Sequence, residues 1–127
     1  MRFMVFKSSK QPTRNNQDSG RPYDVTELIE AYYKSSWHAS CINLKTICIL
    51  GDGIENPDVV ARLSESVRED SIFTLLQKTI LDLRVFGDAF WEIVRTGSSI
   101  EIYHMPSWTV SAGKNGGWIQ ELDSGKV

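Results

Sequence analysis

The side chains most capable of chemistry in this sequence are two histidines and two cysteines, His38, His104, Cys41 and Cys48. His38 and Cys41 have the His-x-x-Cys spacing that places half of a zinc site on one helical face. A complete site needs a third or fourth ligand at close spacing, and the sequence contains no CxxC or HxxxH motif. We therefore expect no bound metal and no other cofactor.

The cysteines raise the alternative of a thiol hydrolase. Cys41 or Cys48 would be the nucleophile, His104 the base and Asp88 the group that orients it. Both cysteines lie in an apolar helical pattern, where burial raises a thiol's pKa and lowers its reactivity. Seven residues of helix also hold their Cα atoms about 10 Å apart, too far for a disulfide. We expect two reduced, buried cysteines, as in a cytosolic protein, and no enzymatic activity.

Two glycine-containing segments resemble phosphate-binding loops only superficially. A phosphate loop needs four residues between its first glycine and a Gly-Lys-Ser/Thr that opens a helix. Residues 113–117, GKNGG, are followed by a strand pattern, and Ser124-Gly125-Lys126 lacks both the hydroxyl residue and the helix. Both segments are predicted to be turns.

Charge divides the chain into two parts. Residues 1–23 carry five basic side chains against one acid, and residues 24–127 carry nine against fifteen. The first part is also polar and rich in Ser, Asn, Pro and Gly, which predicts a flexible basic arm. An acidic body argues against a nucleic-acid-binding surface, because phosphate contacts need clustered Lys and Arg. Nucleic-acid binding therefore rests on the arm alone, and no apolar run is long enough for a membrane span.

Helical patterns fill the chain from residue 24 to 86. Asp24 is predicted to cap a helix, and apolar spacing continues to the stop at residues 51–53, with a break or a new start left open at 35–38. Asn56 and Pro57 form a second start signal. A final helix carries a stripe of four apolar residues and ends at Gly87; the stripe consists of Phe73, Leu76, Ile80 and Leu83.

After Gly87 the apolar period changes from 3.6 to 2. It predicts strands at 89–95 and 100–105 joined by a turn at 96–99, a corner at Pro106, and strands at 108–112 and 118–122. The fold class is α+β, with N-terminal helices packed against a C-terminal antiparallel β-meander. Strand 89–95 is interpreted as scaffold whose outer side forms a protein interface. Because the last turn, 123–125, would normally lead into another strand, we expect a truncated chain.

Three motifs in order resemble the portal proteins of tailed bacteriophages and prophages. FGDAFWEIVR at 86–95 is similar to the family's strand after a helix, with Asp88 where the family usually has Asn. A Gly/Ser turn and IEIYHMPSWTV at 100–110 follow, and SSWHASCINLKTICILGDG at 35–53 resembles the family's upstream helix. The matching residues taken as family markers are Trp37, His38, Lys45, Gly51, Gly53, Gly87, Phe90, Glu92, Arg95 and Pro106.

The resemblance implies a structural protein without catalytic residues. Portals form dodecameric rings at one capsid vertex, where DNA passes as cargo during packaging and ejection. The implied partners are other portal subunits, capsid proteins, terminase and head-tail connector proteins. The implied location is the virion, with the host cytoplasm during assembly. Residues 24–127 would correspond to the N-terminal part of the portal body, or wing. The main alternative is a small non-enzymatic protein-interaction domain unrelated to portals.

Overall fold

The computed structural model describes residues 21, 23–113 and 116–120. Four helices come first: α1 (Val25–Lys34), α2 (Ser36–Leu50), α3 (Pro57–Ser66) and α4 (Ile72–Phe86). The strands β1 (Phe90–Thr96) and β2 (Ser99–Met105) follow. A 3₁₀ turn, η1 (Ser107–Thr109), then leads to β3 (Val110–Ala112) and β4 (Trp118–Gln120). The α+β class is thus confirmed, with helices N-terminal and antiparallel strands C-terminal.

Local signals place the helix ends where the sequence predicts them. The Asp24 side chain accepts a hydrogen bond from Thr26 N at 2.8 Å, and Asn56 caps α3 with Pro57 in the first turn. The open question at 35–38 resolves into two helices, because Ser35 ends α1 and its hydroxyl caps α2. Gly87 ends α4 in the left-handed region, at φ 80° and ψ −2°. Only glycine adopts that conformation without a steric cost.

The strands form two separate antiparallel hairpins, and not the single continuous meander that the sequence suggested. β1 pairs with β2 along seven residues, from Phe90 opposite Met105 to Thr96 opposite Ser99. β3 pairs only with β4. The chain leaves the first sheet because Pro106 and the 3₁₀ turn follow it directly, so residues 108 and 109 belong to a turn where a strand was expected. The last predicted turn and residues 121–122 lie outside the described residues.

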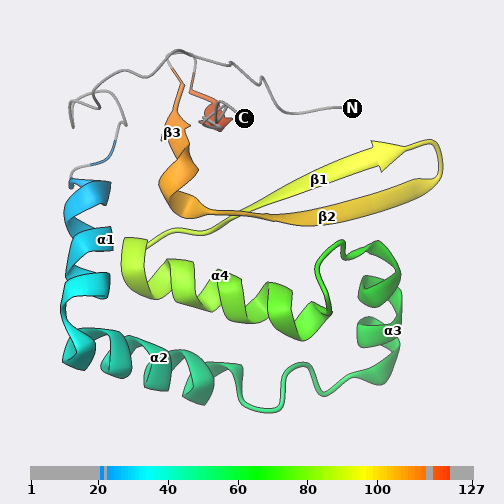
Figure 1. Cartoon of the computed structure of the whole chain (residues 1–127). Coiled ribbons are helices and arrows are strands. Elements are labelled where there is room, and N and C mark those ends of the chain that lie inside the picture. Colours follow the sequence, from blue (N-terminus) through cyan, green and yellow to red (C-terminus); the bar gives the residue numbers. More distant parts are fainter. Residues whose placement is uncertain (1–20, 22, 114–115, 121–127) are drawn as a thin grey trace, which may run out of the picture.

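Helix α4 lies in the middle of the molecule (Figure 1). α2 runs along one side of α4, and the β1–β2 hairpin runs along the other. The most buried cluster joins α4, the hairpin and the segment after α3, and comprises Leu75, Val67 and Ile102. Val67 also forms a parallel bridge with Ile102. This packing gives α4 two covered faces and leaves α2 covered on one.

The apolar stripe predicted for α4 is only partly correct. Leu76 and Ile80 are half-buried, whereas Phe73 and Leu83 are exposed. The buried side chains of α4 follow a different stripe that faces the hairpin, Leu75, Asp82 and Phe86. A helix packed on two sides carries apolar residues over most of its surface, so periodicity does not identify its most buried face.

Candidate interaction surface

Helix α2 has two faces of opposite burial and similar composition. Ile42, Thr46 and Leu50 are buried, and their spacing of four residues places them on the face toward α4. The opposite face carries Trp37, Cys41, Leu44, Ile47 and Cys48, which we call the outer stripe. All five of these side chains are exposed. A helix normally buries its apolar face, so the exposure of a second apolar face is unusual.

The exposure along the outer stripe is large and continuous. Trp37 is 84% exposed, Leu44 63% and Ile47 60%. Together with the two cysteines they present roughly 500 Å² of apolar surface, which is near the top of the range for a typical monomer. Single exposed apolar residues need no explanation, but a stripe over three helical turns marks an interaction surface.

The prediction that both cysteines are buried was wrong. Cys41 and Cys48 are unpaired, as expected, but both are exposed on the outer stripe. Helical periodicity identified the correct set of residues that share a face, but α4 covers the other face. The structure also separates Cys41 from His104, because His104 contacts the opposite side of α4. The thiol, the base and Asp88 do not form a catalytic group.

Three of the family-marker residues lie on the exposed part of α2. Trp37 belongs to the outer stripe, while His38 and Lys45, seven residues apart, flank it on one side. None of the three is part of the buried core. The fold therefore does not explain their presence, whereas contact with another molecule would.

The glycines and the proline among the markers have local roles. Gly51 caps α2 at φ 50° and Gly53 follows at φ 89°, a conformation in which other residues are strained. Pro106 precedes the 3₁₀ turn that ends the hairpin.

The three remaining markers lie on β1. Phe90 packs against Trp118 with ring centroids 4.9 Å apart. Glu92 is half-buried and Arg95 is exposed. None of the three contributes to a reactive group of side chains.

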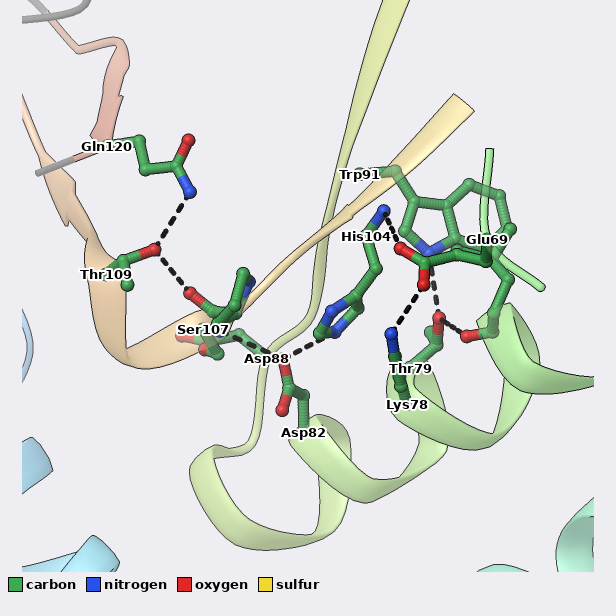
Figure 2. A network of polar contacts seen from close by, with 12 residues as sticks. Glu69, Lys78, Thr79, Asp82, Asp88, Trp91, His104, Ser107, Thr109 and Gln120 are labelled. Carbon is green, nitrogen blue, oxygen red and sulfur yellow. Dashed lines mark hydrogen bonds and ion pairs between the residues drawn. The ribbon is translucent and has the colours of Figure 1, made fainter. Parts of the chain in front are cut away.

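A polar seam joins α4 to the first hairpin (Figure 2). Asp82, 3% exposed, accepts hydrogen bonds at Oδ2 from Ser107 N at 2.9 Å and lies 3.0 Å from His104 Nε2. One turn away, Trp91 Nε1 donates to Thr79 Oγ1 at 2.8 Å. These five residues, which we call the polar seam, are satisfied by one another and fix how the hairpin lies on the helix.

A second polar cluster lies beside the seam at the base of the hairpin. Asp88 accepts a hydrogen bond from the Ser107 hydroxyl and pairs with Arg21 at 3.0 Å. Arg21 Nη2 also donates to the carbonyl of Ser107, and the guanidinium lies over the Phe90 ring. The Tyr23 hydroxyl donates to the Phe86 carbonyl. Arg21 and Tyr23, which the sequence assigned to the arm, thus contact the folded body; residues 1–20 and 22 lie outside the described residues.

Neither cluster joins a nucleophile to a histidine base, because the Ser107 hydroxyl and His104 contact different carboxylates. Ser107 is fully buried, and its hydroxyl donates to Asp88, a carboxylate that does not contact His104 in the described hydrogen bonds. A nucleophile has to reach substrate and be bonded to its base. Among the described residues no three His, Cys, Asp or Glu side chains form a group that could hold a metal ion. Asp82 and Ser107, which are almost completely buried, join α4 to the segment after the first hairpin.

The pKa shifts in the structure come from hydrogen bonds to charged neighbours and, for Tyr23, mainly from burial. Lys78 donates to Glu69 and thereby lowers the pKa of that carboxyl, although partial burial opposes the shift. Arg68 lowers the pKa of Glu101 through their hydrogen bond, while Glu101 raises the pKa of the Tyr103 phenol. Burial, and after it Asp88, raises the pKa of Tyr23. None of these shifts brings a pKa closer to 7, where the group would serve acid-base catalysis.

Sequence reasoning missed the polar seam, since Asp82 interrupts an apolar helical stripe and reads as a solvent-facing residue. One signal was available. Asp82 lies near the C-terminus of α4, where the helix dipole disfavours an acid, and its neighbours Leu81 and Leu83 are apolar. An acid retained there suggests a specific partner.

None of the helices in the described part of the chain has the length and apolar character needed to span a bilayer. Comparison of the sequence with family models and curated proteins, and of the fold with solved structures, finds no match.

Proposed function

We propose that this chain is a structural subunit of a phage portal, part of the body or wing, and acts by contact with other proteins and not by catalysis. The resemblance in three ordered motifs motivates the proposal. The observation that carries it is that Trp37, His38 and Lys45, all in the motif of the upstream helix, are exposed on α2 and have no role in the core. The 84% exposure of Trp37 is explained by a binding partner, whereas exposed His and Lys side chains are ordinary.

The order of elements also supports the proposal. α4 ends at Gly87, β1 follows, Gly97 turns the chain at φ 61°, and β2 runs to Pro106. The family's second and third motifs follow the same order of helix, strand, Gly turn, strand and proline. In a portal, the proposed partners are neighbouring subunits, capsid proteins, terminase and connector proteins, and DNA is only cargo.

The proposal is tested by mass spectrometry of purified particles from a host that carries the gene. Peptides of this chain should co-purify with full virions in an amount that matches a single dodecameric ring per particle. An interaction domain unrelated to portals, which is the second candidate, predicts that the peptides stay in the cytosolic fraction. Peptides in large excess over one ring would contradict a portal and indicate a capsid or decoration protein.

The genomic neighbourhood gives a second readout. A terminase gene is expected beside this gene. A neighbourhood with no packaging gene would remove the ring and conduit functions from the proposal.

A further inference from the structure

We propose that the outer stripe of α2 binds the outer stripe of a second copy of this chain, with the two helices antiparallel about a two-fold axis. The proposal does not rest on the portal assignment. A ring with one rotation axis joins two different surfaces of neighbouring subunits, so a two-fold contact would be a state of the free chain. Where the chain does enter a ring, assembly would have to displace this contact.

The spacing of the stripe is that of a two-helix seam. Trp37, Cys41, Leu44 and Cys48 are separated by four, three and four residues, which is the a/d pattern of a coiled coil. α2 is straight and regular through this stretch and ends only at Gly51. Ile47 lies at the edge of the seam and is 60% exposed. A second helix could therefore lie along the whole stripe.

Residue size favours a second copy in the antiparallel orientation. A two-fold axis between Cys41 and Leu44 places Leu44 of each copy against Cys41 of the other, and Trp37 against Cys48. Every layer then joins one large side chain to one small one, which is how helix interfaces fill space without voids. A parallel pair would instead stack Trp37 on Trp37 and leave two layers that each contain two cysteines. The outer stripe is therefore complementary in shape to the outer stripe of an antiparallel second copy.

Charge does not oppose the contact. α2 contains no carboxylate, and its only formal charge is Lys45, which lies beside the seam and not in it. Antiparallel helices also place opposite ends of their dipoles together. The pair would bury on the order of 1,000 Å² in total, the lower limit for a specific interface. We therefore expect a weak dimer, with a dissociation constant on the order of 10–100 µM.

The first test is sedimentation equilibrium of the full chain. The wild-type chain should fit a monomer–dimer equilibrium, and Leu44→Glu should raise the dissociation constant at least about 30-fold by placing a charge in the seam. Ile93→Glu is the matched control, because Ile93 on β1 is also exposed, at 58%, and lies outside the stripe. It should change the constant by less than about threefold. Circular dichroism establishes that each variant is folded.

The second test determines the orientation by disulfide trapping. In Leu44→Cys/Cys48→Ser, the introduced thiol faces Cys41 of the other copy, within disulfide reach, so mild oxidation should give a covalent dimer. Adding Cys41→Ser leaves one thiol per copy and should abolish trapping. The wild-type chain should also trap poorly, because each of its cysteines faces a large apolar residue. A parallel pair predicts the reverse, with rapid trapping of the wild type through Cys41.

Each remaining outcome overturns the proposal. A chain that stays monomeric up to about 1 mM has no self-contact stronger than about −4 kcal/mol, and the stripe then belongs to a different protein. A dimer that survives Leu44→Glu uses another surface. If the chain forms a species larger than a dimer and Leu44→Glu dissociates it, the contact is not a closed two-fold interface. The mass-spectrometry test on purified virions can succeed or fail independently of these three outcomes.

Discussion

The polar seam and the outer stripe of α2 invert the usual placement of polar and apolar groups. The seam buries Asp82 and Ser107 almost completely, and the stripe exposes Trp37 and Leu44 by more than half. In the seam every buried group has a partner within the chain, which fixes the orientation of the hairpin on α4. In the stripe the apolar groups have no partner among the described residues. The first region determines the fold, and the second is available for binding.

The largest expected effect lies in the seam. Asp82→Ala should lower the free energy of unfolding by about 3 kcal/mol, because it leaves Ser107 N without its acceptor and removes the partner of His104. Urea unfolding at constant m-value measures the change. Asp82→Asn keeps an acceptor and should cost less. A change below about 0.5 kcal/mol for Asp82→Ala would mean that the seam does not hold the hairpin.

The cluster beside the seam should be next in magnitude. Asp88→Asn removes the negative charge next to Arg21, whose side chain is 4% exposed, and should cost about 2 kcal/mol. Since Asp88 stands where the portal family usually has Asn, Arg21 offers a physical reason for the acid here. In Arg21→Met, the effect of Asp88→Asn should shrink to less than about 1 kcal/mol. If Asp88→Asn had the same effect in the wild-type and Arg21→Met chains, Asp88 and Arg21 would not be coupled.

The end of α4 gives a backbone test that involves no packing. Gly87→Ala should destabilise by about 1 kcal/mol, because a side chain at φ 80° is strained although no atom lies near the new methyl group. Gly117→Ala is the control, since its added methyl also meets open space and its φ is outside the left-handed region. Thermal unfolding of the two variants should separate them. Equal melting temperatures would show that the left-handed cap does not matter.

The residues at the helix ends show which features could be predicted from the sequence alone. Asp24, Asn56 and Gly87 act on the backbone within four residues, so local pattern sufficed to place the helix ends. Which face of α2 is buried depends on the position of α4, and a helix with apolar residues on two opposite faces does not encode it. Asp82 and His104 are 22 residues apart and meet only through the fold. The seam and the exposed stripe were therefore beyond prediction from one sequence.

Acid should weaken the attachment of the hairpin by a smaller amount. The pKa values of Glu69 and Glu101 are lowered in the folded state, so their contribution is present above the ordinary carboxyl pKa of about 4.3 and is lost as pH falls through the folded values. Glu69→Gln should cost about 0.5–1 kcal/mol at pH 7 and less at pH 3. Glu65→Gln, exposed on α3, is the control. An equal loss at both pH values would exclude the ionic contribution.

The smallest effect should be in the outer stripe. Leu44→Ala, measured at low protein concentration, should change the free energy of unfolding by less than about 0.5 kcal/mol. Leu50→Ala, the same substitution on the buried face of the same helix, should cost about 2–3 kcal/mol. Similar costs for the two leucines would mean that the outer stripe is part of the core, and the contrast between the two regions would fail.

The most direct test of the outer stripe is the alkylation rate of Cys41 and Cys48 in the native chain as a function of protein concentration. The structure exposes both thiols. We expect both thiols to be labelled rapidly at low protein concentration and progressively more slowly as the chain associates. In Leu44→Glu, labelling should be rapid at all concentrations. Slow labelling of the dilute wild-type chain would contradict the exposed stripe, and a rate independent of concentration would contradict its occupation by a second copy.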